Sequence, residues 1–104
     1  MFSLDDLARI IAARAHASAD KSYTKSLLDK GAPACARKFG EEGIEFVIAA
    51  ISQDNAAVKS EAADVLYHLL VTLQARGIAL ADVLAELDQR TRRSGLEEKA
   101  SRKP

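Results

Sequence analysis

Apolar residues recur at helical spacing in four stretches of the chain, and no stretch shows the alternation of a β-strand. The first stretch, residues 4–17, follows Ser3, which with Asp6 forms an acidic variant of the helix capping box. Residues 18–31 are polar and end at Gly31, so we expect a loop there with one helical turn at residues 25–29. The pattern predicts an all-α fold of four to five helices.

The two central stretches predict a pair of helices. Pro33 suits the first turn of the earlier one. Four of its apolar residues share one stripe: Ile44, Val47, Ile48 and Ile51. Residues 53–55 can end this helix and cap the next, which Arg76 and Gly77 should close as a basic last turn and a terminating glycine. We therefore expect a central antiparallel helical hairpin.

The remaining segments complete the predicted architecture. Leucine spacing predicts a fourth helix at residues 80–87, although Ala79 is a poor N-cap. Residues 94–104 are charged and nearly free of apolar side chains, which by composition alone indicates disorder. We expect a single domain at residues 1–93 followed by this charged tail. Because a chain of 104 residues builds only a small core, we also expect a homodimer, assembled as a dimeric helical bundle.

Charge and cysteine usage exclude several classes of protein. Lys plus Arg equal Asp plus Glu, at 15 each, so the overall field predicts neither a nucleic acid nor a membrane as partner. The single Cys35 cannot form an internal disulfide, which favours a reducing cytoplasmic location. The N-terminus lacks a basic region followed by an apolar run, and no stretch approaches about 18 apolar residues. We expect neither secretion nor a membrane span.

Acidic residues on the central helices carry the candidate chemistry. Glu41, Glu42 and Glu45 fall in one sector of the first helix, and Glu61 and Asp64 share a strip of the second. The simplest interpretation of such a cluster is a solvated surface. However, no Lys or Arg lies one turn after the three glutamates of the first helix, where a solvated face would place cations. The missing partners suggest a bound cation.

Carboxylates without thiol or paired imidazole are hard oxygen ligands, which suit Mg²⁺, or Mn²⁺, better than zinc. Mg²⁺ commonly shares its coordination shell with substrate phosphates and supplies an activated water. The sequence therefore favours hydrolysis of a phosphate ester or anhydride. Lys38, one turn before Glu42, could neutralise a phosphate or simply pair with that glutamate.

The acidic residues read EExxE and then ExxD, and this pattern resembles the MazG-like all-alpha nucleoside triphosphate pyrophosphatases. Within that superfamily the chain is similar to the phosphoribosyl-ATP pyrophosphatase family over nearly its whole length. The segments that carry the likeness are residues 22–24, 38–42, 61–71 and 82–83, with Gly77 and the tail at 94–100. The resemblance implies Mg²⁺-dependent hydrolysis of phosphoribosyl-ATP to phosphoribosyl-AMP and pyrophosphate, the second step of histidine biosynthesis.

The resemblance also implies roles for individual residues. The residues that match the family's metal ligands are Glu42, Glu45, Glu61 and Asp64. Glu41 would complete the catalytic set by binding a second ion or orienting the first. The candidate substrate-binding residues are Lys38, Lys21, Tyr23 and Arg37. We expect Tyr67 to pack between helices with its hydroxyl bonded at the edge, and Cys35 to be a small buried residue.

Two other functions fit the same residues. The first keeps the chemistry but acts on canonical or damaged nucleoside triphosphates, as house-cleaning MazG-like enzymes do. The second is a helical dimerisation module without catalysis, whose acidic residues would be ordinary surface. Turnover of a nucleotide panel separates the first alternative, and Mg²⁺ titration by calorimetry separates the second.

Overall fold

The computed structural model of this protein describes residues 1–92, in which five helices and no strand occur. The helices are α1 (Leu4–Arg14), α2 (Tyr23–Asp29), α3 (Ala32–Ser52), α4 (Asn55–Ala75) and α5 (Leu80–Thr91). The predicted all-α class is confirmed. The expected tail at residues 94–104 lies outside the described residues.

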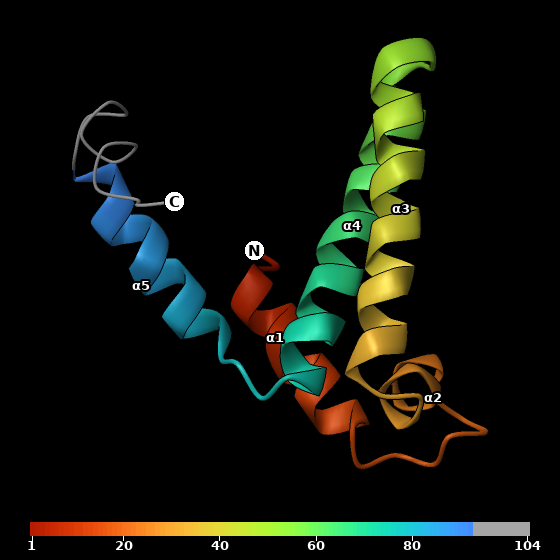
Figure 1. Ribbon diagram of the computed structural model, residues 1–104, viewed down its shortest axis with the longest axis vertical. Coiled ribbons are helices and arrows are strands. Elements are labelled where there is room, and N and C mark those ends of the chain that lie inside the picture. The colour runs from red at the N-terminus through yellow and green to blue at the C-terminus, as the bar shows by residue number, and fades with distance from the viewer. Residues whose placement is uncertain (93–104) are drawn as a thin grey trace.

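The central hairpin is formed by α3 and α4, which run side by side over their whole length (Figure 1). Asp54 caps α4 by accepting a hydrogen bond from the backbone N–H of Ala57 at 2.9 Å. Gly77 adopts a φ of 70° at the end of α4, where the N–H of Ile78 donates to the carbonyl of Leu73 at 2.9 Å. A glycine tolerates this left-handed conformation, and the bond closes a Schellman motif. Local sequence signals therefore set both ends of α4.

The core lies at the lower end of this hairpin in Figure 1, where α1 and α2 pack against α4. Its buried cluster draws on α1, α2, α3 and α4 and comprises Ile11, Leu27, Cys35, Leu70 and Val71. The Cys35 thiol donates to the carbonyl of Leu27 at 3.3 Å, which confirms it as a small buried residue. A contact set drawn from four helices fixes the base of the hairpin.

Two predicted boundaries were wrong. The first helix ends at Arg14 instead of residue 17, because the chain leaves the helix before the polar connection to α2. The loop expected at residues 18–31 contains a true helix that begins at Tyr23, two residues before the single turn expected there. Ser22 caps this helix by accepting a hydrogen bond from the N–H of Lys25 at 3.1 Å. The serine thus starts a helix.

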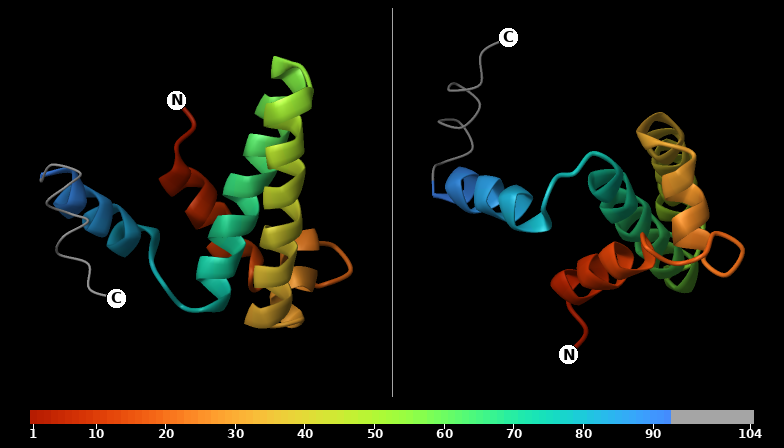
Figure 2. Two further views of the ribbon diagram at one scale, coloured as in Figure 1. Left: turned by 45° about the horizontal axis from the view of Figure 1, so that its top comes forward. Right: turned by 90° about the horizontal axis from the view of Figure 1, so that it is seen from below.

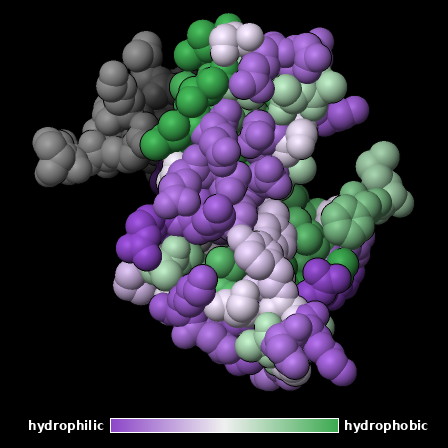
Figure 3. Space-filling model, turned by 90° about the vertical axis from the view of Figure 1, so that its right-hand side faces the viewer, coloured by the Kyte–Doolittle hydropathy of each residue, from purple (hydrophilic) through white to green (hydrophobic). Residues whose placement is uncertain are grey.

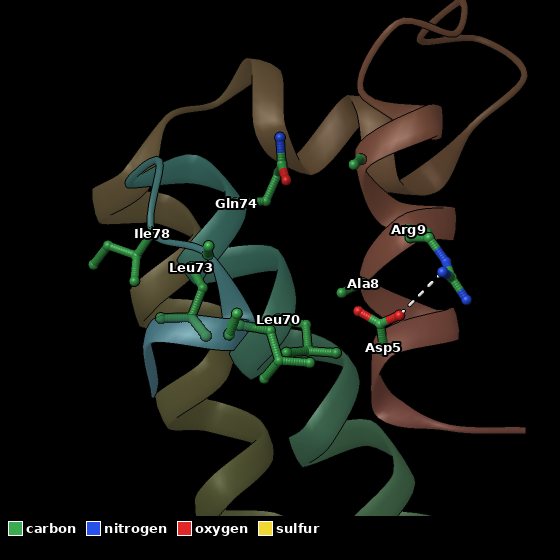
Figure 4. Close-up of a pocket in the computed structure, with 11 residues that line it drawn as sticks. Asp5, Ala8, Arg9, Leu70, Leu73, Gln74 and Ile78 are labelled. Atoms are coloured by element: carbon green, nitrogen blue, oxygen red, sulfur yellow. Dashed lines mark ion pairs between the residues drawn. The ribbon is translucent and has the colours of Figure 1, made fainter. Parts of the chain in front are cut away.

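Helix α5 stands apart from the other four in every view (Figures 1 and 2). It has no buried residue, and Ala79 makes no side-chain capping bond, as its residue type predicted. A groove of about 240 Å³ lies between α1, the end of α4 and the connection to α5 (Figure 4). Leu70, Leu73 and Ile78 line it, and the ion pair of Arg9 with Asp5, at 3.1 Å, borders it. None of the five motif acids lines this groove.

The apolar stripe of α3, defined as Ile44, Val47, Ile48 and Ile51, is exposed in the single chain. Its exposed fractions are 64%, 52%, 49% and 80%, so the stripe does not face α4. Hydrophobic surface gathers near the upper end of the molecule in Figure 3, the end that carries the α3–α4 turn. Within residues 1–92 no single helix is long and apolar enough to span a membrane; α4 and α5 meet that criterion only as a pair bent by 112°.

Candidate active site

Three carboxylates meet between the two helices of the hairpin. Glu42 and Glu45, one turn apart on α3, and Glu61 on α4 each offer an oxygen, and these oxygens lie within 4.8 Å of one another. Glu42 is buried, Glu61 is half-buried and Glu45 is exposed. We call these three residues the acidic cluster. The hairpin brings together three of the four metal ligands implied by the sequence.

The acidic cluster has the properties of a cation site. Oε2 of Glu61 is buried, yet it has no hydrogen-bond partner among the described residues. An unpartnered buried carboxylate oxygen is costly, because it has lost water without gaining a donor. Carboxylate oxygens at this spacing can share one hard divalent cation such as Mg²⁺ or Mn²⁺. The residues present therefore fit a resident divalent metal.

Crowding of negative charge perturbs the cluster when no metal is bound. The pKa of Glu45 is raised above its ordinary value, first by its hydrogen bond and repulsion with Glu42, then by burial and by Glu61. Lys38 opposes this effect, and its Nζ lies 3.3 Å from a carboxylate oxygen of Glu42 and 3.8 Å from one of Glu41. Hydrogen bonding and attraction to Glu42 in turn raise the pKa of Lys38. The lysine therefore stays cationic beside the cluster.

Two of the predicted catalytic acids lie outside the acidic cluster. Glu41 points to solvent with a side chain 58% exposed, although it remains beside Lys38. Asp64 is exposed on α4, one turn beyond Glu61, and its carboxylate is not among the oxygens within 4.8 Å. Its negative charge nevertheless raises the pKa of His68, so it faces the same side of α4. Its role as a metal ligand stays a prediction.

An aromatic group adjoins the acidic cluster. The Tyr67 hydroxyl lies 2.5 Å from the hydroxyl of Thr24, which confirms the expected bonded edge position of this tyrosine. Tyr23 stacks on Tyr67 with ring centroids 6.4 Å apart and an angle of 16° between the planes. His68 meets Tyr67 edge-on at 4.9 Å. Burial lowers the pKa of His68 more than the nearby Glu42 raises it, so this imidazole is neutral at neutral pH.

The predicted substrate-binding residues other than Lys38 divide into two groups. Tyr23 and Lys21 line a pocket of about 540 Å³ together with Arg14 and Thr24. Arg37 is exposed and lines neither this pocket nor the other three pockets described in residues 1–92. The sequence interpretation missed Arg14, which belongs neither to the acidic motif nor to the segments that carry the family likeness. Thr24 does belong to one of those segments, residues 22–24, and it lines the pocket beside Tyr23.

Comparison with known proteins identifies the family. The family model described as phosphoribosyl-ATP pyrophosphohydrolase matches residues 4–91. The chain belongs to this family. A phosphoribosyl-ATP pyrophosphatase of Azorhizobium caulinodans is 61% identical over 100 residues, which cover 96% of this chain and 92% of that protein. Phosphoribosyl-ATP pyrophosphatase 1 of Bradyrhizobium diazoefficiens is 60% identical over 102 residues, covering 98% and 96%. The family resemblance inferred from the acidic motif is confirmed.

The match to the phosphoribosyl-ATP pyrophosphohydrolase family includes the acidic cluster. The matched range begins with α1 and ends with α5, so it includes the acidic cluster, Lys38 and the aromatic group. All five helices therefore lie within the range that the family model matches. An unpartnered buried oxygen, as at Glu61, and repulsion between like charges, as at Glu45, are features that functional sites commonly show at the expense of stability.

Repulsion in the acidic cluster predicts that Glu45→Gln stabilises the metal-free protein. A raised pKa means that folded Glu45 binds protons more tightly than unfolded Glu45, so its contribution to stability falls as pH rises through this pKa. At neutral pH in chelator, the urea midpoint of the variant should exceed that of the wild type. The difference should shrink as pH is lowered and the glutamate becomes neutral.

Glu86→Gln is the matched control for this measurement. Glu86 is an exposed residue of α5 that pairs with Arg90 at 3.1 Å, so losing its charge removes this attraction and leaves the acidic cluster unchanged. Its urea midpoint should stay level or fall slightly. A Glu45→Gln midpoint below that of the wild type in chelator at neutral pH would contradict the repulsion.

Proposed function

We propose that this chain hydrolyses phosphoribosyl-ATP to phosphoribosyl-AMP and pyrophosphate, the second step of histidine biosynthesis, and that it requires Mg²⁺. The observation that carries the proposal is the buried, unpartnered oxygen of Glu61 in a three-carboxylate cluster. Family membership across residues 4–91 supports the substrate. An acidic site that can bind Mg²⁺ suits a triphosphate substrate, because Mg²⁺ commonly binds carboxylates and substrate phosphates together.

In the proposed mechanism, Glu42, Glu45 and Glu61 would hold the metal, with Asp64 as a further ligand. A bound divalent cation would lower the pKa of a water and neutralise charge on the phosphate oxygens. Lys38 is placed to bind a phosphate oxygen beside the cluster. Water then attacks the α-phosphorus and pyrophosphate leaves, while a glutamate of the EExxE segment receives the proton. No covalent enzyme intermediate is needed, and Cys35 is a poor nucleophile because its thiol is buried, donates to a backbone carbonyl and has a pKa raised by burial.

We also propose that the active unit is a homodimer. The described chain buries only six hydrophobic residues, whereas the α3 stripe and Leu84 and Leu87 of α5 remain exposed. Such continuous apolar faces are unusual on a monomer and mark association surfaces. Helix α5 gains no burial from its own chain, so a second copy is the partner that would cover both faces.

Loss of a cluster charge should abolish turnover. Glu45→Gln and Asp64→Asn keep side-chain shape but remove the charge that holds a hard cation. Each should turn over phosphoribosyl-ATP at less than about a tenth of the wild-type rate at saturating Mg²⁺, with unchanged helicity by circular dichroism. Glu86→Gln should behave as the wild type. Activity above that level in Asp64→Asn would remove Asp64 from the ligand set, and the same result for Glu45→Gln would refute the metal site.

Hydrolysis in ¹⁸O-labelled water tests the reaction itself. Attack at the α-phosphorus places one labelled oxygen in phosphoribosyl-AMP and none in pyrophosphate, which mass spectrometry of both products would measure. Label in pyrophosphate would mean attack at the β-phosphorus. Failure to release pyrophosphate, or faster turnover of other nucleoside triphosphates in a parallel panel, would overturn the proposed substrate.

The dimer proposal predicts a two-chain species in sedimentation at micromolar concentration. Ile48→Asp places a charge within the α3 stripe and should shift the protein to a monomer. Ala50→Asp is the matched control, because Ala50 is exposed on the same helix outside the stripe. A wild-type monomer with full activity would refute the dimer as the active unit.

A further inference from the structure

The pocket beside the aromatic group is basic. We call it the basic pocket; it has a volume of about 540 Å³ and is lined by Arg14, Ala17, Lys21, Ser22, Tyr23, Thr24 and Tyr67. Arg14 and Lys21 are its only charged lining residues, and no acid lines it. Within residues 1–92 neither cation forms an ion pair, whereas Arg9, Lys25 and Lys38 all pair with acids. Two cations without partners around one pocket indicate an anionic ligand.

The basic pocket and the acidic cluster are joined by Tyr23. This tyrosine lines the pocket, and its ring meets His68 edge-on at 6.3 Å. Its phenol also raises the pKa of Lys38, so it lies within electrostatic range of the lysine that borders Glu42. A ligand that begins at the acidic cluster can therefore continue past Tyr23 into the basic pocket.

On the basis of the proposed function, we propose that the basic pocket binds the phosphate of the phosphoribosyl group. Phosphoribosyl-ATP carries anionic groups at two ends, a triphosphate and this single phosphate. The reacting triphosphate needs a divalent cation, and among residues 1–92 the acidic cluster is the one group of side chains that offers ligands for it. A single phosphate needs cationic donors, which the guanidinium of Arg14 and the ammonium of Lys21 supply.

This assignment gives the site a means of distinguishing its substrate from ATP. The two share the triphosphate, so contacts at the acidic cluster cannot separate them. A site whose charged donors bind the phosphoribosyl phosphate binds ATP less well, because ATP lacks this phosphate and leaves the donors without a partner. Tyr23, 57% exposed and stacked on Tyr67 through one face, lies between the two ends, where a purine ring would pass.

The two products separate the two ends of the substrate and so provide the test. Phosphoribosyl-AMP keeps the phosphoribosyl phosphate, and pyrophosphate carries the leaving end. By calorimetry, the wild type should bind phosphoribosyl-AMP more tightly than AMP. The double variant Arg14→Gln/Lys21→Gln should lose that preference, weakening phosphoribosyl-AMP about ten- to a hundredfold, since two charge-assisted contacts are removed. Inhibition by pyrophosphate should be unchanged, and KM for phosphoribosyl-ATP should rise more than kcat falls.

Lys30→Gln is the matched control, because Lys30 is an exposed cation at the other end of α2 and lines no pocket described in residues 1–92. It should bind phosphoribosyl-AMP as the wild type does. Weaker pyrophosphate inhibition in the double variant would show that the pocket holds the leaving end and would overturn the assignment. Equal wild-type affinity for phosphoribosyl-AMP and AMP would also overturn it. Release of pyrophosphate by the wild type reports separately on the proposed function.

Discussion

The fold has to sustain one unfavourable interaction, the crowding of three carboxylates between α3 and α4. Glu42, Glu45 and Glu61 approach within 4.8 Å because the two long helices lie side by side, and Lys38 is the one cation of residues 1–92 that pairs with the cluster. A surface patch would relieve this repulsion by turning its side chains into water. Here the hairpin prevents that for Glu42 and for one oxygen of Glu61. In the metal-free protein, burial of the core at the base of the hairpin must therefore offset the repulsion among these carboxylates.

The hydrophobic core that offsets this repulsion is small. Its buried apolar residues gather where α1, α2 and α4 meet, while the far end of the hairpin and all of α5 contribute exposed apolar faces. A core of this size leaves a small margin of stability, and repulsion among the acids reduces that margin. The orientation of α3 explains both the acidic cluster and the exposed apolar stripe. This helix directs Glu42 and Glu45 toward α4 and its apolar stripe away from α4. A partner on that stripe would stiffen the same helix that carries Glu42 and Glu45.

The sequence predicted most reliably the elements whose signals are local. Pro33 and Asp54 mark the starts of α3 and α4, Gly77 marks an end, and the acidic spacing placed the cluster on facing strips of these helices. Helix α2 was underestimated because seven residues cannot sustain a helix alone. Burial of Leu27 and the bond of Thr24 to Tyr67 hold it, and both contacts cross many residues of sequence. The exposed position of Asp64 was equally invisible, since spacing fixes a face of a helix but not the reach of a short side chain.

Although the formal net charge of the chain is zero, the protein has one acidic region, the acidic cluster, and one basic region, the basic pocket. Tyr23 and Tyr67 line the basic pocket, and the ring of Tyr23 also meets the neutral His68, whose pKa is affected by Glu42 of the acidic cluster. If His68 were charged it would weaken the attraction of the acidic cluster for a cation, and burial prevents this by lowering its pKa. Within residues 1–92 the carboxylates of the acidic cluster form no ion pair with Arg14 or Lys21, so the carboxylates stay available for a metal and the two cations for an anion.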